Sequence, residues 1–531
     1  MMKTPPEFFK IKNVHYCYLV AFVLVLPALL INLGAMPLVA DEPTRALVAL
    51  EMYFSDNYIV PTINGEYYYN KPPLYNWLLA GLYHLTGQMN EWVIRFPTVF
   101  SILIFALIIF VFVRKYTDTR TAVFTILAYI TCGRVLFYDS FLGLIDTLFS
   151  ALIFLNFMVL YQFDKKNEYA KLFLWSYLIM TVAYFLKGLP ALVFEAISLL
   201  ALAALRRKIR FLFSGYHFLG IGIFVLFLLA YYSQYLRYNT IDVLVKTLIT
   251  ESTKRTAAAH GTMESLLHLF SFPFEVVLHF LPWTAPLFLL LKKSSRRFIF
   301  ENDFLKYNLV MLLANIAVYW LSPETRPRYL FMFLPPVFIL SFSLLMQESN
   351  LKFRTVMEKI FLFLLVLFVI APLTIPFVPM IPAVGMKWGK VILLSLSMLL
   401  ILLFYLQNNQ ERLFLFCIAL LVARIGFDWF VFPSRLQTEP QVAYRSEAIK
   451  VGKFTKGQPM ALYKYSAINH DISFYVSRER GGILYHAFGT PKKNIFYLTD
   501  IVDEELKTAK VYMQFRESYN NTMLYLVRIE R

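Results

Sequence analysis

Long apolar runs are the feature of this sequence that most constrains its fold. About thirteen runs fall near residues 16–36, 92–113, 121–138, 143–162, 171–187, 190–205, 213–235, 266–291, 305–321, 328–347, 356–378, 387–407 and 412–432. A helix of roughly 20 apolar residues crosses a bilayer. Only 16% of the 531 residues are charged, whereas a soluble protein carries about 25%. We therefore predict a polytopic α-helical membrane protein.

Basic residues cluster between alternate apolar runs. The clusters are Arg114, Lys115 and Arg120; Lys165 and Lys166; Arg206, Arg207, Lys208 and Arg210; Lys292, Lys293, Arg296 and Arg297; and Lys352, Arg354 and Lys359. Cytoplasmic loops carry an excess of Lys and Arg, so this alternation predicts a cytoplasmic N-terminus. It also accounts for the net charge of +17, and we expect no nucleic-acid partner. The run at 16–36 lacks a cleavage site and is predicted to remain as a helix.

The composition changes after residue 432. Residues 433–531 are polar, carry charges of both signs and alternate short apolar stretches with turn signals. Residues 494–498 and 523–527 are typical of strands, and 447–454 of a helix. We predict a transmembrane domain over 1–432 and an extracytoplasmic α/β domain over 433–531. The three cysteines (Cys17, Cys132, Cys417) have no metal-ligand spacing and are predicted to pack inside the bundle.

The outer loop at 37–91 contains the most specific residues. Asp41 precedes a segment with helical spacing, so its side chain is suited to cap that helix. It is equally suited to accept a proton or hydrogen bond from an acceptor group. Asn64–Gly65 predicts a turn. Lys71 precedes two prolines that stiffen the backbone, and it is either an ordinary interfacial lysine or a point charge for a lipid phosphate.

These segments carry a family resemblance. The segment DEPTR, the stretch VPTINGEYYYNKPPLYNWL and Arg95–Phe96–Pro97 resemble the start of polyprenyl-phosphate-sugar glycosyltransferases of the GT-C fold. The nearest group is the bacterial aminoarabinose lipid A transferase and protein O-mannosyltransferase superfamily. The resemblance implies about thirteen transmembrane helices and a C-terminal extracytoplasmic α/β domain. It further implies a multi-pass protein of the bacterial inner membrane, with that domain in the periplasm.

The resemblance also implies roles for single residues. Asp41, with Glu42 beside it, would engage the acceptor, and Asp146 would be the second catalytic carboxylate, with Asp139 as the alternative. The donor phosphate would be bound by Lys71, Lys187, Arg326, Arg328 and Tyr329. Further acceptor or loop residues are Arg45, which is displaced by one position from the family's arginine, and Glu251, Arg255 and His260 of the second long loop.

The implied reaction is transfer of a hexose or pentose from a polyprenyl (undecaprenyl) phosphate donor to a lipid A, glycan or protein acceptor. Asn70 stands where the family has a glutamate, which removes a carboxylate from any metal site. We therefore expect no cofactor, although a divalent metal would be compatible with the reaction. The expected partners are the lipid-linked donor, a membrane-embedded or periplasmic acceptor and membrane lipids. The alternatives are a transporter or flippase of lipid-linked or anionic substrates, and a non-catalytic lipid-binding assembly protein.

Overall fold

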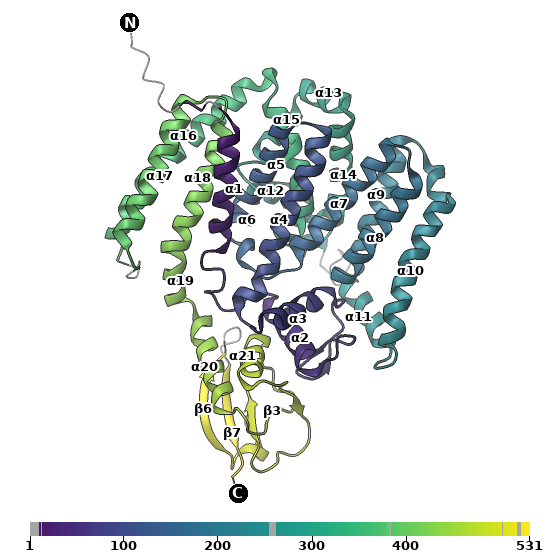
Figure 1. The fold of residues 1–531 in the computed structure, drawn as a ribbon. Helices are drawn as coiled ribbons and strands as arrows, with labels where there is room; N and C mark the ends of the chain where they lie inside the picture. Colours follow the sequence, from purple (N-terminus) through teal and green to yellow (C-terminus); the bar gives the residue numbers. More distant parts are fainter. Residues whose placement is uncertain are drawn as a thin grey trace.

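Long helices lying side by side form the larger part of the molecule (Figure 1). The computed structural model describes residues 10–11, 13–253, 262–379, 381, 384–501, 503–517 and 522–530. The helices of the bundle are α1 (His15–Leu30), α4 (Glu91–Tyr116), α5 (Thr119–Thr131), α6 (Gly133–Phe137), α7 (Asp146–Lys165), α8 (Tyr169–Lys187), α9 (Pro190–Arg206), α10 (Gly215–Tyr235), α12 (Thr262–His279), α14 (Asp303–Trp320), α15 (Leu334–Leu345), α16 (Leu351–Thr374), α17 (Lys387–Gln407) and α18 (Arg412–Gly426).

Eight described helical segments are long and apolar enough to cross a membrane, or nine if the bent pair of α5 and α6 forms one span. Their outward surfaces fit a lipid environment. Only 11% of the apolar window of α10 is buried inside the protein, and a large exposed apolar surface marks contact with a membrane or a partner. The chain is therefore a multi-pass membrane protein. The count of thirteen spans stays a prediction.

Each predicted span contains a helix, but several helices are shorter than the runs. α1 ends at Leu30, with Asn32 at a φ of 58°. The run at 266–291 divides into α12 and the 3₁₀-helix η5 (Ala285–Leu291). Pro282 and Pro286 lie at this division, and proline cannot donate the backbone hydrogen bond that would continue a helix.

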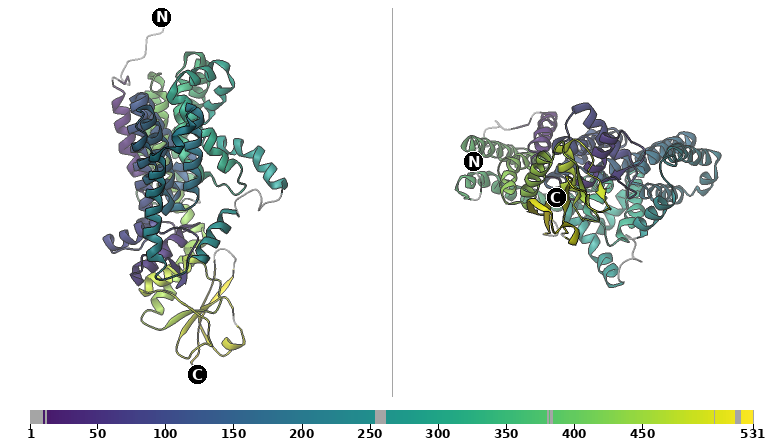
Figure 2. Two further views of the ribbon diagram at one scale, coloured as in Figure 1. Left: turned by 90° about the vertical axis from the view of Figure 1, so that its right-hand side faces the viewer. Right: turned by 90° about the horizontal axis from the view of Figure 1, so that it is seen from below.

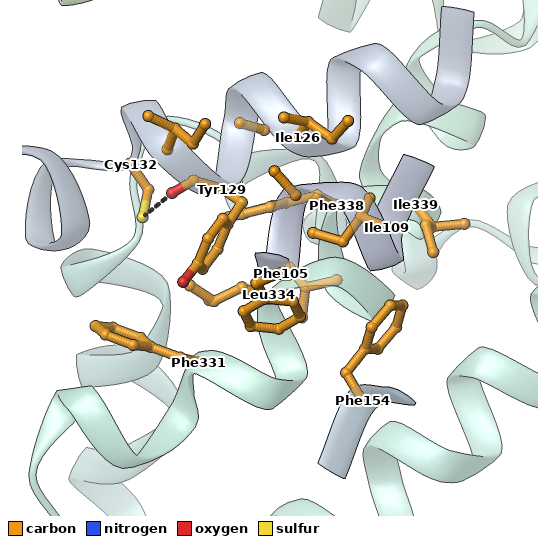
Figure 3. Packing of buried hydrophobic residues seen from close by; sticks show 14 of the residues in the cluster. Phe105, Ile109, Ile126, Tyr129, Cys132, Phe154, Phe331, Leu334, Phe338 and Ile339 are labelled. Atoms are coloured by element: carbon orange, nitrogen blue, oxygen red, sulfur yellow. Dashed lines mark hydrogen bonds between the residues drawn. The ribbon is translucent and has the colours of Figure 1, made fainter. Parts of the chain in front are cut away.

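Aromatic and aliphatic side chains fill the centre of the bundle (Figure 3). The ring of Phe105 on α4 lies 4.7 Å from that of Tyr129 on α5 and 5.7 Å from that of Phe154 on α7, measured between centroids. The Cys132 thiol donates a hydrogen bond of 3.3 Å to the Tyr129 carbonyl oxygen. All three cysteines are buried and unpaired, which confirms their predicted packing role.

The first loop folds into two helices joined by a hairpin. α2 (Glu42–Ser55) is followed by β1 (Thr62–Ile63), β2 (Glu66–Tyr67) and α3 (Leu74–Thr86). The predicted turn is confirmed, because Asn64 and Gly65 connect the strands with φ of 52° and 77°. Positive φ at both positions is the requirement of a type I′ hairpin. The hairpin places the Lys71 segment directly after it.

The C-terminal region forms a mixed five-stranded sheet at one end of the bundle (Figure 2). Its strands are β3 (Met460–Tyr463), β4 (His486–Ala487), β5 (Phe496–Thr499), β6 (Lys510–Arg516) and β7 (Met523–Arg528), in the order β4-β3-β5-β7-β6. β3 is parallel to β4 and β5, and β7 is antiparallel to β5 and β6. The predicted strands and helix are confirmed, the helix as part of α20 (Pro440–Phe454).

This sheet region shares its core with the first loop. Leu47 of α2 and Leu79 of α3 belong to the same buried cluster as Ile472 of α21 (His470–Arg480) and Leu498 of β5. Burying these apolar surfaces together stabilises the contact by roughly 25 cal/mol per Å² removed from water. The shared core holds α21 against α2. A second, smaller cluster around Tyr463 and Tyr497 lies entirely within residues 433–531.

Candidate active site

A pocket of about 230 Å³ opens where the bundle meets the C-terminal region. It is lined by Asp41, Thr44, Arg45, Tyr68, Asn70, Lys71, Leu144, Ile145, Asp146, Lys187, Tyr329 and His470. Most of these side chains are polar or charged. They come from α2, the segment before α3, the start of α7, the end of α8, the 3₁₀-helix η6 (Pro327–Phe333) and the start of α21.

One carboxylate at the pocket pairs with two cations. Asp146 is 5% exposed, and its Oδ1 accepts a 2.5 Å hydrogen bond from the Nζ of Lys187. The Arg328 Nε lies 3.2 Å from its other carboxylate oxygen. A buried carboxylate requires such partners, because the cost of removing one unpaired charge from water is several kcal/mol. This trio joins α7, α8 and η6.

Aromatic rings complete the surroundings of Lys187. Its ammonium lies 4.2 Å from the centre of the Tyr329 ring and 4.9 Å from that of Phe149. A desolvated cation over an aromatic face gains about 2 kcal/mol. Lys71 lines the same pocket, directly before the buried residues Pro72 and Pro73. The lysines predicted to bind phosphate therefore share one pocket.

Asp41 is the exposed carboxylate of the site. Its side chain is 56% exposed, and it pairs with the buried Arg328 guanidinium. The capping alternative is wrong, since Asp41 occupies the N-cap position of α2 without accepting a side-chain capping bond. Arg328 thus contacts both predicted catalytic carboxylates, Asp41 and Asp146.

Glu42 is turned away from the pocket. It is fully buried, and its two carboxylate oxygens accept hydrogen bonds from the Arg95 guanidinium at 2.8 and 2.9 Å. The backbone amides of Gly143 and Val39 donate to the same oxygens at 2.6 and 2.9 Å. This geometry favours a structural role over the predicted catalytic one.

Three more predicted residues, Asp139, Arg326 and Arg328, are not among the lining residues. Asp139 is buried and accepts a 2.6 Å hydrogen bond from Arg134, so Asp146 fits the second-carboxylate role better. Arg326, at the start of η6, is exposed.

The second long loop is described only in part. Glu251 lies in α11 (Asp242–Thr253), whose apolar residue Leu244 packs beside Val60 and Tyr235. Arg255 and His260 lie outside the described residues.

The lining residues to which sequence reasoning gave no role include Thr44, Tyr68 and His470. The Arg45 guanidinium donates a hydrogen bond to the Tyr68 hydroxyl and lies over its ring. The Nδ1 of His470 lies 2.8 Å from the Thr44 hydroxyl. Burial and the charge of Arg45 lower the pKa of His470 below its usual value, so its ring is neutral at pH 7. No local sequence signal marks His470, because its partner is 426 residues away.

The charges of the site favour an anion. Lys71, Lys187, Arg45 and Arg328 supply four positive charges against two carboxylates, Asp41 and Asp146. An excess of two positive charges at a partly desolvated pocket suits a phosphate group. Within the described ranges there is no group of three His, Cys, Asp or Glu side chains arranged to hold a metal ion.

Comparisons with known proteins agree with this architecture. Residues 70–232 match the family model of dolichyl-phosphate-mannose-protein mannosyltransferases. An uncharacterized protein of Aquifex aeolicus is 22% identical over 474 residues, covering 86% of this chain and 87% of that protein. The undecaprenyl phosphate-alpha-4-amino-4-deoxy-L-arabinose arabinosyl transferase of Shewanella sediminis is 34% identical over 103 residues, 19% of this chain and 18% of that protein.

Solved structures show the same fold. The crystal structure of ArnT from Cupriavidus metallidurans bound to undecaprenyl phosphate aligns with a TM-score of 0.71 at 16% identity, over 97% of this chain and 98% of that one. Its apo state aligns with a TM-score of 0.70 at 17% identity. Fold and pocket together define a polytopic membrane protein of the GT-C type, with a sheet region at one end.

The matched family segment contains Lys71, Asp146 and Lys187 of the pocket. The chain has the GT-C fold, and the similarities to these proteins confirm the predicted family resemblance. These similarities support a glycosyltransferase better than they support a transporter.

Proposed function

We propose that this protein transfers a sugar from a polyprenyl phosphate, in bacteria undecaprenyl phosphate, to an acceptor at the outer face of the inner membrane. The observation that carries the proposal is the pocket lined by Lys71 and Lys187, whose two carboxylates, Asp41 and Asp146, both pair with Arg328. The names of the similar proteins support the donor class, since they include an undecaprenyl-phosphate-bound structure and a dolichyl-phosphate-mannose family. The transferred sugar is a hexose or a pentose.

The cations act on the donor side. In the transition state the bond between the anomeric carbon and the phosphate oxygen breaks, and negative charge grows on the departing polyprenyl phosphate. Lys71, on a backbone stiffened by Pro72 and Pro73, and Lys187, held by Asp146, are fixed before the reaction begins. Preorganised charges of this kind stabilise a developing anion without reorganising.

Asp41 acts on the acceptor side. A new bond forms between the anomeric carbon and the acceptor oxygen as the phosphate leaves, with inversion at that carbon. The acceptor proton passes to the Asp41 carboxylate, which is exposed to the pocket and oriented by Arg328. Asp146 holds Lys187 and Arg328 in position. The acceptor is a lipid A, glycan or protein group in the membrane or periplasm.

The membrane orientation belongs to the same proposal. The basic loops support a cytoplasmic N-terminus. The pocket lies at the end of the bundle that carries residues 433–531, which is the periplasmic end in this orientation. Neighbouring membrane lipids cover the exposed apolar faces of α10 and α16.

The substitution Asp41→Asn separates this proposal from a transporter. We expect sugar transfer to fall at least a hundredfold, the usual contribution of a positioned acid or base, while the purified variant still binds undecaprenyl phosphate. Asp56→Asn is the matched control, since Asp56 is exposed at the end of α2 and outside the pocket lining. Full transfer by Asp41→Asn would refute the proposal.

A further inference from the structure

The C-terminal region contributes a side chain to the pocket. Thr44 follows Asp41 by three positions, so the two side chains lie on the same side of the start of α2. The Thr44 hydroxyl lies 2.8 Å from the Nδ1 of His470, the first residue of α21. All three residues line the pocket. The wall that includes Asp41 is therefore continued by His470.

The position of His470 is rigidly set. The backbone amide of Asn469 donates a 2.8 Å hydrogen bond to the Glu517 carboxylate. Two and five residues further along α21, Ile472 and Tyr475 are 1% exposed and belong to the core shared with α2. His470 is thus held from the sheet side and from the bundle side.

The histidine ring has one nitrogen left for a ligand. Its neutral form has one donor and one acceptor nitrogen, and Nδ1 is engaged by Thr44. Within the part of the chain that the structure describes, no hydrogen bond of Nε2 is found. Nε2 is therefore available to a molecule in the pocket, beside the exposed Asp41 carboxylate.

We propose that Asp41 and His470, with Thr44 orienting the ring, form the acceptor subsite, and that this subsite binds a carbon-bound hydroxyl group. The inference rests on the proposed function and names the acceptor chemistry. A hydroxyl group donates its proton to the Asp41 carboxylate. Its oxygen lone pairs, or a neighbouring hydroxyl of the acceptor, form a hydrogen bond with the His470 ring. An anionic phosphate acceptor would meet the Asp41 carboxylate and a neutral ring, while Arg328 is already paired with both carboxylates and Arg45 is engaged by Tyr68. The lysines of the pocket remain with the donor phosphate.

Two substitutions separate a ligand contact from a structural role. His470→Asn keeps a polar group near the Nδ1 position and has none near Nε2, whereas His470→Gln reaches the Nε2 position. The assay is transfer from a polyprenyl-phosphate sugar to an envelope extract from a strain lacking this protein. We expect His470→Asn to raise the acceptor KM about tenfold, the loss of one hydrogen bond, and His470→Gln to stay within about threefold of wild type.

Donor binding and product linkage complete the test. Thermal stabilisation by undecaprenyl phosphate should be the same in both variants and in wild type, and mass spectrometry should show the sugar on a carbon-bound oxygen. His486→Gln is the matched control, because this second histidine of the C-terminal region bonds the Lys464 carbonyl oxygen outside the pocket lining. Its transfer kinetics should equal those of wild type.

Four results would overturn the inference. These are unchanged acceptor KM in both variants, greater damage in His470→Gln than in His470→Asn, loss of stabilisation by undecaprenyl phosphate in the variants, and a product joined through phosphate. A wild-type protein that neither transfers sugar nor is stabilised by undecaprenyl phosphate would refute the proposed function, and the subsite with it. If the wild type is active and the His470 variants have the same acceptor KM as wild type, only the subsite is refuted.

Discussion

The ion pair between Glu42 and Arg95 gives the sharpest test of a role assigned from the structure. Arg95 is 1% exposed and donates five hydrogen bonds. Two go to the Glu42 carboxylate and three to backbone carbonyl oxygens, those of Leu33, Met36 and Pro37. The pair fixes the chain between α1 and α2, immediately before Asp41. We expect Glu42→Gln to destabilise the protein.

The magnitude follows from the contacts that are lost. Gln has one acceptor oxygen in place of a carboxylate that accepts from Arg95 twice and from Gly143 and Val39 once each. The side-chain amide of Gln would also turn an N–H donor toward the N–H donors of Arg95, Gly143 and Val39. Leaving a buried guanidinium without its anion costs about 3–5 kcal/mol. The ratio of folded to unfolded protein should fall by roughly two to four orders of magnitude.

Unfolding in detergent, followed by heat or denaturant, measures this loss. The fraction of Glu42→Gln that stays folded should keep the donor and acceptor KM of wild type. Glu66→Gln is the matched control, because Glu66 is exposed on β2 of the same loop. The double substitution Glu42→Gln with Arg95→Gln removes both charges and should regain part of the stability.

A stable but inactive Glu42→Gln protein would refute this reasoning. That outcome would mean that Glu42 takes part in the reaction, as its place beside Asp41 in the sequence suggests. Equal losses in the single and double variants would also contradict it, since they would show that the two charges are not coupled.

Three further predictions concern the loop and the donor side. Burial raises the pKa of Glu51 from 4.5 to about 7, so the folded protein retains a proton that the unfolded chain releases, and stability should fall as pH rises from 4.5 to 7. Glu51→Gln should remove this pH dependence of thermal unfolding. Gly65→Ala should lower stability by at least about 1 kcal/mol, measured by the same unfolding assay, because φ is +77° and a Cβ would lie 2.2 Å from the Tyr485 ring. Lys187→Met should weaken binding of undecaprenyl phosphate at least about tenfold, whereas Lys171→Met, at an exposed pair on the same helix, should not; equal affinities would contradict the role of Lys187.

Apolar runs predicted the helix bounds well where a helix contacts only lipid and neighbouring helices. The predicted span at 387–407 coincides with α17 (Lys387–Gln407). Prediction failed where proline interrupts an apolar run, as between α12 and η5, because composition alone does not show the break. The core shared by α2 and α21 was also beyond prediction, since the two helices are hundreds of residues apart in the sequence.

The site residues, too, were predictable from the sequence only in part. The motif residues Asp41 and Lys71 were predicted, and the structure places both in the pocket. Glu42 belongs to the same motif, yet its side chain points to Arg95, which periodicity could not separate from a position facing the pocket. His470 has no motif at all. It joins the site only through tertiary packing, which local sequence signals do not encode.

The Thr44–His470 contact has a consequence for biosynthesis. Its two residues are made 426 positions apart, and α21 is fixed by strands β5 to β7, which follow it in the chain. A nascent chain grows by about 5–20 residues per second, so the helices enter the membrane well before His470 meets Thr44. An insertion intermediate would already hold the lysines for the lipid phosphate and still have an incomplete acceptor wall. If the proposed function and orientation hold, sugar transfer begins only after the C-terminal region has crossed the membrane and folded.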